Sequence, residues 1–149
     1  MPLAGHAPDR LRAAPSSWED IVGKASLLTA ARECRAGYQS IAGLNEAMRR
    51  GEPEAVELVQ LWARWLARGL AALAHIHDPD EIIIGGELTM LFEGASTVVE
   101  AELRRGLLAH FPTPRLSASR FQSDGCAIGA AAIMHASLFS AVSSEPVKL

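Results

Sequence analysis

The chain has 149 residues, of which 49% are hydrophobic and 21% charged, a balance typical of one folded domain rather than a disordered chain. Lys and Arg number 14 against 17 Asp and Glu, and the formal net charge of -3 lacks the basic footprint of a nucleic-acid-binding protein. Cys34 and Cys126, the two cysteines, cannot form a disulfide framework or fill a four-ligand zinc site by themselves. The N-terminus shows no basic segment followed by an apolar run, so we expect a cytoplasmic protein with no membrane partner.

A loop and then a helix are predicted at the start of the chain. Residues 1–15 are rich in Pro, Ala and Arg without a clear period, which predicts a loop-like N-terminal segment. Ser16 and Glu19 have the spacing of a capping box, and Ser17 and Asp20 repeat it one residue later. A helix is therefore predicted to begin here.

Apolar residues continue at helical spacing, and we expect this first helix to end at Gly37. Residues 38–52 contain a shorter helical stretch. A long helix is then predicted from Pro53, since proline favours the first turn, to about His77, before Asp78-Pro79. It has a broad apolar face, with acidic residues leading and basic residues following, as the helix dipole favours.

A strand–helix–strand pattern follows the long helix. Glu81–Ile84 has three consecutive β-branched residues, which predicts a short, fully buried strand covered on both faces, as in a parallel sheet. A helix is predicted over Ser96–His110, and a weaker second strand over Arg115–Arg120. Helices alternating with strands indicate an α/β fold.

One segment could be read as a membrane span, because no charged residue occurs from Gly125 to Ser144. The segment consists largely of Ala, Gly and Ser, with His135 in its middle, and these residues add little transfer energy. We therefore expect a packed helix that begins near Cys126. Residues 143–149 are predicted to form a flexible tail.

Four residues in three segments are candidates for binding. Gly85 and Gly86 directly follow the predicted strand, where exposed backbone N–H groups could bind a phosphate, although a simple strand-to-loop turn also explains them. Glu19 could accept hydrogen bonds from sugar hydroxyls, or it could only cap its helix. His6 lies in the unpatterned N-terminal segment, where a histidine is usually solvated.

The other histidines, His75, His77, His110 and His135, have no acidic or cysteine partner at metal-ligand spacing, so we expect no metal site. The three-residue spacing of Trp62 and Trp65 is typical of core or interface aromatics.

Several segments together match one pattern. Trp62–Gly86 combines a long helix, Asp78-Pro79, a strand and a di-glycine, and Asp124–Ala131 reads as a small-residue helix start. This order resembles the ROK family of sugar kinases and sugar-responsive repressors. Ser17–Glu19 resembles that family's Cys-Leu/Trp-Glu motif, whose Glu binds the sugar, and Gly5-His6 resembles the end of its Glu-x-Gly-His motif.

The resemblance implies an α/β fold: a partial actin-like ATPase (ribonuclease H-like) C-terminal lobe, helix-rich with a small sheet, over residues 16–142. It implies nucleotide binding at Gly85 and Gly86 and sugar binding at Glu19 and His6, with ATP and Mg²⁺ as the family's cofactors. It identifies no catalytic residue in this chain.

The departures from the family pattern limit these expectations. Leu3 stands where the Glu of Glu-x-Gly-His would lie, and Ser17 stands where the last zinc-binding cysteine would lie. We therefore expect the family's zinc to be absent and His6 to have no metal role. The Asp-x-Gly phosphate loop and the Asn-Asp pair with its general base have no counterpart, so the isolated chain is predicted not to phosphorylate sugars.

Three hypotheses remain open: part of a ROK-type sugar kinase, part of a ROK-type transcriptional regulator, or a non-catalytic interaction or oligomerisation module. In the second case the DNA-binding helices would lie upstream, and this chain itself would bind no nucleic acid. The resemblance places further strands before residue 1, so the strand at Ile82–Ile84 would have one partner, near Leu116–Arg120. Unpaired strand edges predict a homo-oligomer, pairing with another chain, or a truncated fragment.

Overall fold

The computed structural model describes residues 17–121 and 124–142. The predicted loop over residues 1–15, the tail over residues 143–149 and the Ser16 capping pair lie outside the described residues.

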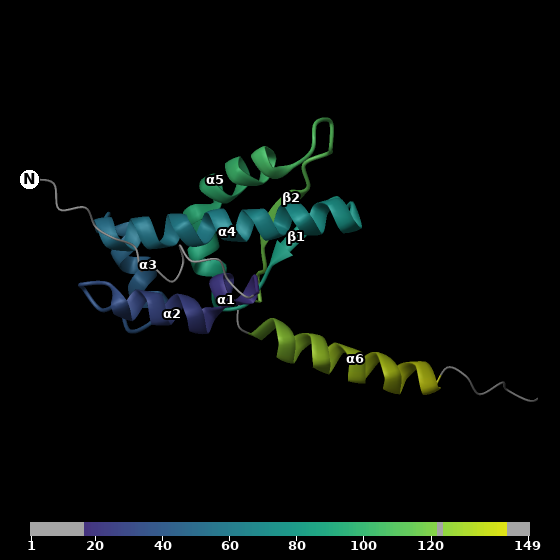
Figure 1. The fold of residues 1–149 in the computed structure, drawn as a ribbon. Helices are drawn as coiled ribbons and strands as arrows, with labels where there is room; N and C mark the ends of the chain where they lie inside the picture. The colour runs from purple at the N-terminus through teal and green to yellow at the C-terminus, as the bar shows by residue number, and fades with distance from the viewer. Residues whose placement is uncertain (1–16, 122–123, 143–149) are drawn as a thin grey trace, which may run out of the picture.

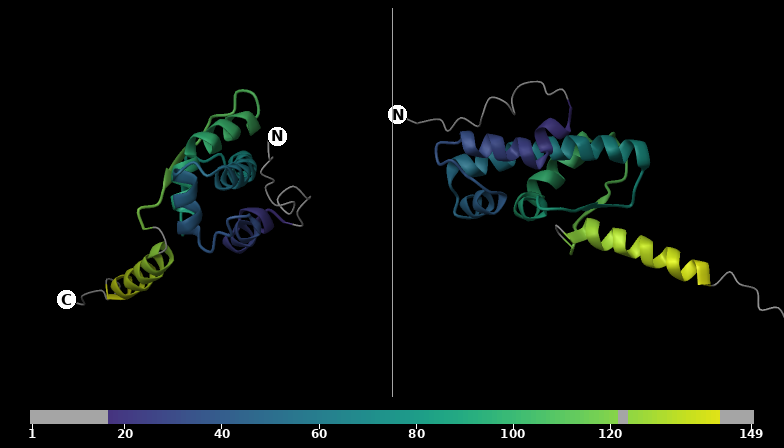
Figure 2. Two further views of the ribbon diagram at one scale, coloured as in Figure 1. Left: turned by 90° about the vertical axis from the view of Figure 1, so that its left-hand side faces the viewer. Right: turned by 90° about the horizontal axis from the view of Figure 1, so that it is seen from below.

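A long central helix organises the described part of the chain (Figure 1). The elements in chain order are α1 (Glu19–Val22), α2 (Lys24–Glu33), α3 (Ile41–Arg49), α4 (Pro53–His77), β1 (Glu81–Ile84), α5 (Thr89–Gly106), β2 (Arg115–Ala118) and α6 (Gly125–Val142). Helix α4 contacts α1, α2, α3 and α5, and the views in Figure 2 show these helices gathered around it while α6 stands apart.

The bounds of α4 confirm the sequence prediction. Pro53 is its first residue, where the missing proline N–H costs nothing because the first turn has no intrahelical acceptor. Asp78 ends it in the left-handed region, at φ 45° and ψ 53°, and donates its N–H to the Ala74 carbonyl at 2.8 Å.

The start of the first helix follows the predicted capping pair. The Asp20 N–H donates to Ser17 Oγ at 3.2 Å, and the Ser17 N–H donates to Asp20 Oδ2 at 2.9 Å. This reciprocal pair satisfies two backbone donors that the first turn leaves without helical partners.

The prediction of one continuous helix to Gly37 is wrong, because the backbone leaves the helix at Gly23 and α2 ends at Glu33. Gly23 is extended, at φ -67° and ψ 149°, and its N–H closes α1 on the Glu19 carbonyl at 2.9 Å. A Cβ atom at Gly23 would lie 2.6 Å from that carbonyl oxygen. The close approach therefore requires glycine at this position.

The two strands form a parallel sheet in which Glu81 pairs with Arg115 and Ile84 with Ala118. The predicted pairing of these segments is confirmed. Ile82 and Ile84 pack against the core, but the side chain of Ile83 is 64% exposed. The prediction of a fully buried strand covered on both faces is wrong, because within the described residues the core packs against the Ile82 side only.

Helix α5 begins at Thr89 and ends at Gly106, so the predicted bounds of Ser96–His110 are displaced toward the C-terminus. Gly94, which precedes the predicted helix, lies inside α5. A Cβ atom there would overlap the terminal methyl of Met48 on α3. Gly94 is thus a point of close packing between α3 and α5.

Helix α6 begins one residue before the predicted Cys126, but residues 126–136 are exposed. The prediction that this helix packs is wrong for these residues. In the described part of the chain, no helix combines the length and the apolar character that crossing a membrane requires.

The core lies between α4 and the helices around it, and most of its members are aliphatic. Its largest fully buried hydrophobic side chains are Trp62, Ile21, Leu27, Leu44, Leu58, Leu91 and Leu103. The prediction that Trp62 is a core aromatic is confirmed.

Two titratable groups lie at the edge of this core. The side chain of Cys34 is buried, which raises the pKa of its thiol to about 11, and the carboxylate of Glu54 acts in the same direction. The Tyr38 hydroxyl donates to Glu52 Oε2 at 2.8 Å. Burial and then this hydrogen bond raise the pKa of Tyr38 to about 12.

We expect the free energy of unfolding to fall as the pH rises from 9 to 11, because the unfolded thiol of Cys34 loses its proton first. Each proton retained only by the folded state lowers stability by about 1.4 kcal/mol per pH unit in this range. Urea unfolding at several pH values measures this slope. Cys34→Ala should have a smaller slope; equal slopes for wild type and Cys34→Ala would contradict the assignment.

Candidate functional site

The di-glycine loop at the carboxyl end of β1 is open. Gly85 is exposed and Gly86 is partly buried, with φ +83°. A Cβ atom at Gly86 would have nothing within 4 Å. The positive φ favours glycine, and the space beside it leaves the backbone accessible to a ligand.

Thr89, the first residue of α5, holds this loop through hydrogen bonds. Its side chain is 1% exposed, and its hydroxyl donates to the Gly86 carbonyl at 2.6 Å while its N–H donates to the same oxygen at 3.1 Å. On the other side, the Ser119 N–H donates to the Ile84 carbonyl at 2.7 Å and extends the strand pairing. The loop is therefore held in one conformation at the edge of the sheet.

Glu19 lies exposed on α1. The neighbouring Trp18 anchors this short helix, since its indole Nε1–H donates to the Trp65 carbonyl of α4 at 2.9 Å. Trp62 of α4 reaches the other end of α1, and its Nε1–H donates to the Val22 carbonyl at 3.1 Å. Two tryptophans thus hold the segment that carries Glu19.

An ion pair joins the two candidate regions. Lys24, the first residue of α2, pairs with Glu87, which directly follows the di-glycine. Both side chains are about half-exposed, so the pair contributes little stability by itself. The pair nevertheless shows that the start of α2 lies beside the Gly85–Gly86 loop. The short helix α1, which directly precedes α2, therefore also lies close to this loop. His6, the fourth predicted site residue, lies outside the described residues.

The described histidines do not gather with other metal ligands. His75 accepts a hydrogen bond from the Leu108 N–H at 3.2 Å, and its ring meets Phe111 edge-on at a centroid distance of 4.8 Å. Within residues 17–121 and 124–142, no three His, Cys, Asp or Glu residues are grouped to hold a metal ion. The absence of the zinc site remains a prediction.

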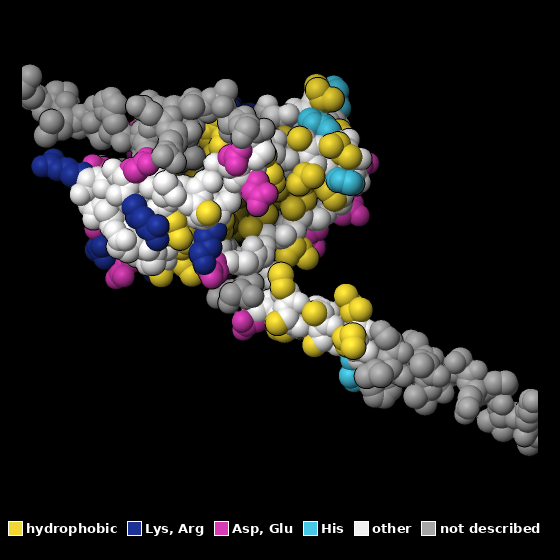
Figure 3. Space-filling model, turned by 60° about the horizontal axis from the view of Figure 1, so that its bottom comes forward, with side chains coloured by type: hydrophobic (Ala, Val, Ile, Leu, Met, Phe, Trp, Pro, Cys, Tyr) yellow, Lys and Arg dark blue, Asp and Glu magenta, His cyan; other side chains and the backbone are white. Residues whose placement is uncertain are grey.

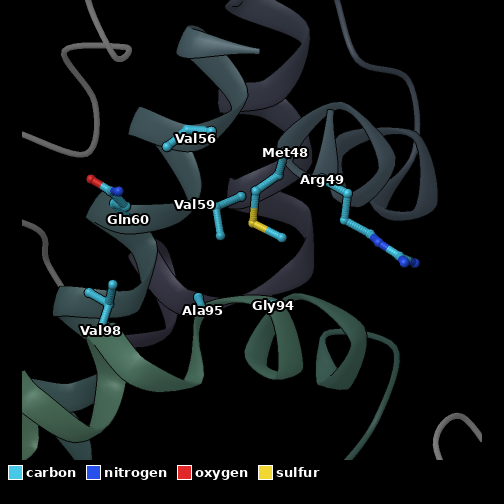
Figure 4. A pocket seen from close by; sticks show the side chains of 8 residues that line it. All are labelled: Met48, Arg49, Val56, Val59, Gln60, Gly94, Ala95 and Val98. Atoms are coloured by element: carbon cyan, nitrogen blue, oxygen red, sulfur yellow. The ribbon is translucent and has the colours of Figure 1, made fainter. Parts of the chain in front are cut away.

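A cavity that the sequence did not predict lies between α3, α4 and α5 (Figure 4). Its volume is about 280 Å³, and Met48, Val59 and Val98 contribute apolar side chains. Arg49 extends away from the other labelled side chains and also lines a neighbouring hollow of about 400 Å³. Asn45 lines that hollow, and its Oδ1 is buried without a hydrogen-bond partner in the described part of the chain.

Neither hollow contains a predicted site residue. The lining of the 280 Å³ cavity comes from three helices that are separate in sequence, whereas the second hollow is lined by α3 and its C-cap residue Arg50. The polar residues of α3 are patterned like an ordinary solvent-facing side. No signal in the sequence marks this cavity, which is consistent with its origin in helix packing.

Comparison with known proteins places these features in a family. The model of the ROK family matches residues 14–137. A glucokinase of Pyrobaculum calidifontis is 29% identical over 108 residues, which cover 66% of this chain and 36% of the glucokinase.

Two solved structures have a similar fold at 23% identity. A ROK family glucokinase from Streptomyces griseus, in complex with glucose and AMPPNP, has a TM-score of 0.65 over 81% of this chain and 45% of that chain. A ROK hexokinase from Thermus thermophilus has a TM-score of 0.60 over 83% of this chain and 43% of that chain. The chain thus spans less than half the length of the relatives it matches.

Proposed function

This chain belongs to the ROK family, and we propose that it forms the nucleotide- and sugar-facing C-terminal part of a ROK-type sugar kinase. Its fold is part of the actin-like fold of ROK glucokinases, helix-rich with a two-stranded sheet, as the sequence predicted. The observation that carries the proposal is the open Gly85–Gly86 loop at the carboxyl end of β1, where ligands bind in α/β folds.

The loop fits the triphosphate end of a nucleotide. Gly86 has space beside its backbone, and Thr89 holds its carbonyl away from the open side. A fixed, side-chain-free backbone lets a phosphate approach the N–H groups closely. When bound, ATP with Mg²⁺ would supply the transferable phosphoryl group. The chain's own role is to position that nucleotide along one wall of the site.

Glu19 is the proposed sugar contact. Its carboxylate is exposed, and carboxylate oxygens accept hydrogen bonds from hydroxyl groups. The Trp18 and Trp62 hydrogen bonds fix the helix that carries it, and the Lys24–Glu87 pair holds the start of the next helix, α2, near the nucleotide loop. The residues proposed for sugar and nucleotide therefore belong to neighbouring parts of one lobe.

We further propose that these 149 residues do not catalyse phosphoryl transfer alone. The family's general base belongs to an Asn-Asp pair that has no counterpart in this sequence, and a sugar hydroxyl needs such a base to attack efficiently. The short span relative to the glucokinases supports the same conclusion. That the named relatives are sugar kinases favours a kinase over a transcriptional regulator.

The catalytic part of the proposal is tested by a coupled ADP-release assay on the purified chain with a panel of hexoses. We expect no turnover above that of Glu19→Ala, which keeps the fold because Glu19 is exposed. Hexose-dependent ADP release by the wild-type chain that is lost in Glu19→Ala would show that the chain is catalytically complete.

Nucleotide binding is tested with Gly86→Val. The added side chain occupies the space where the phosphate would lie, so the Kd for AMPPNP measured by calorimetry should rise by about tenfold or more. Gly51→Val is the matched control, because Gly51 also has a positive φ, of 76°, and open space beside it. Equal affinities of the two variants would contradict nucleotide binding at the loop.

A further inference from the structure

The cavity between α3, α4 and α5 has the size and the lining of a site for a small molecule. Its volume of about 280 Å³ is close to the lower end of the range for such sites, about 300–1,000 Å³. Val56 and Val59 of α4 and Val98 of α5 line it together with Met48 of α3 (Figure 4). The cavity therefore suits a compact apolar group.

A polar atom lies next to this apolar space. Gly94 lines the cavity, and a Cβ atom at Gly94 would lie 3.6 Å from Asn45 Oδ1 and would overlap the terminal methyl of Met48. Asn45 lines the neighbouring hollow of about 400 Å³, and Arg49 lines both spaces. Met48 is unbranched and can change its rotamer, so a ligand could extend from one space into the other. The two spaces are thus adjoining parts of one candidate site.

The side-chain oxygen of Asn45 is an acceptor without a donor. Asn45 Oδ1 is buried, and within the described residues it has no hydrogen-bond partner. Buried polar atoms in folded proteins are nearly always hydrogen-bonded, because an unsatisfied one costs free energy. A ligand that donates one hydrogen bond to this oxygen would remove that cost.

A hydroxyl group fits this acceptor better than an ammonium group. A hydroxyl has one O–H to donate, whereas an ammonium has three N–H donors and a charge. The carboxylate of Glu46, which lines the same hollow, already pairs with Arg50 at 3.4 Å. An ammonium beside Asn45 would therefore keep unsatisfied donors away from water, which is unfavourable.

Arg49 supplies a positive charge at the same place. Its neighbour Arg50 pairs with Glu46 and Glu52, but the Arg49 guanidinium has no ion pair or hydrogen bond within the described residues. On the face shown in Figure 3, the described Lys and Arg side chains are scattered rather than gathered into one basic patch. One planar guanidinium matches one carboxylate, which it can bind through two parallel hydrogen bonds.

We propose that this cavity binds a small α-hydroxy carboxylic acid with a branched aliphatic side chain. The aliphatic group fills the apolar cavity, the hydroxyl donates to Asn45 Oδ1, and the carboxylate pairs with the Arg49 guanidinium. The lining of the cavity includes neither Glu19 nor the Gly85–Gly86 loop, so the site is separate from the proposed nucleotide and sugar contacts.

Three related acids test the proposed chemistry by calorimetry on the full chain. Leucic acid has all three groups, isocaproic acid lacks the hydroxyl, and leucine has an ammonium in its place. We expect saturable binding of leucic acid with a Kd of about 1 mM or tighter, and weaker binding of the other two by about fivefold or more. Leucic acid that does not bind at millimolar concentrations, or leucine that binds as tightly, overturns the inference.

Variants of the chain locate the site. Val98→Phe places a ring in the cavity and should weaken leucic acid by about tenfold or more. Ala101→Phe is the matched control, because Ala101 is exposed on the same helix. Arg49→Gln should also cost about tenfold, whereas Arg104→Gln, which replaces another exposed arginine, should cost nothing. Unchanged affinity in Val98→Phe, or equal affinities of the two arginine variants, overturns the inference.

Asn45→Ala isolates the hydroxyl contact. In this variant leucic acid should lose its advantage over isocaproic acid, because the acceptor that distinguishes them is gone. A preserved advantage overturns the assignment of the hydroxyl to Asn45. Arg49→Gln and Asn45→Ala keep the inference testable if the Val98→Phe variant does not fold.

The nucleotide experiment is independent of this one. Gly86→Val should leave the Kd for leucic acid unchanged, and saturating AMPPNP should not displace leucic acid. Displacement by AMPPNP would show that the cavity belongs to the nucleotide site, and would overturn the inference of a separate site. Binding of leucic acid to a chain that does not bind AMPPNP would retain this site and remove the proposed nucleotide function.

Discussion

Trp62→Ala is expected to destabilise the chain by about 3–5 kcal/mol, the range for removing a large aromatic side chain from a packed core. Trp62 is 1% exposed and lies in the middle of α4, the helix that the others surround. Its loss also removes the Nε1–H that satisfies the carbonyl of Val22, the last residue of α1. Since small domains have stabilities of about 5–15 kcal/mol, the loss is a large fraction of the total.

Trp62→Phe separates the two contributions. Phenylalanine fills most of the space but cannot donate to the partly buried Val22 carbonyl, so we expect a loss of about 1–3 kcal/mol, the cost of leaving such a group without its hydrogen bond. Urea unfolding of both variants measures the difference, and the phenylalanine variant remains informative if the alanine variant does not fold. A loss for Trp62→Ala no greater than that for Trp62→Phe would show that burial of the ring is not what stabilises α4.

The elements predicted well are those whose ends carry a strong local signal. Pro53 and the left-handed Asp78 set the bounds of α4, and the three consecutive isoleucines mark β1. Each of these signals acts through the backbone of a few neighbouring residues. Tertiary packing did not shift the ends of α4 or the position of β1 away from those that the local signals predict.

The errors occur where a glycine has a role that only the tertiary structure defines. Gly23 ends α1 because its backbone approaches the Glu19 carbonyl, whereas the apolar period continues through it. Gly94 does the opposite, since it continues α5 and allows Met48 to pack. The exposure of Ile83 depends on what covers the sheet, which a local pattern cannot report.

In the candidate site too, the features with a local sequence signal were predicted, and those that depend on tertiary contacts were not. The Gly85–Gly86 loop was located from the strand before it, but its anchor, Thr89, lies before the predicted helix over Ser96–His110. The Lys24–Glu87 pair joins residues far apart in sequence, and neither residue belongs to a motif. The roles of Glu19, Gly85, Gly86 and His6 in binding remain predictions.

Gly69→Ala is expected to destabilise the chain, although replacing a helical glycine by alanine normally stabilises a helix by about 1 kcal/mol. A Cβ atom at Gly69 would overlap the indole ring of Trp18, which lies across α4 and donates to the Trp65 carbonyl. Overpacking of this kind costs about 1–3 kcal/mol, so we expect a net loss. The displaced indole should also become more accessible to a fluorescence quencher.

A double-mutant cycle with Trp18→Ala isolates this contact. In the Trp18→Ala background the overlap is gone, so Gly69→Ala should be neutral or stabilising there. Because Trp18 holds α1, Gly69→Ala should also disturb the position of Glu19, the proposed sugar contact, while leaving the Gly85–Gly86 loop unchanged. If Gly69→Ala stabilises the wild-type chain as much as the Trp18→Ala variant, the indole does not pack against α4, and the anchoring of Glu19 must come from elsewhere.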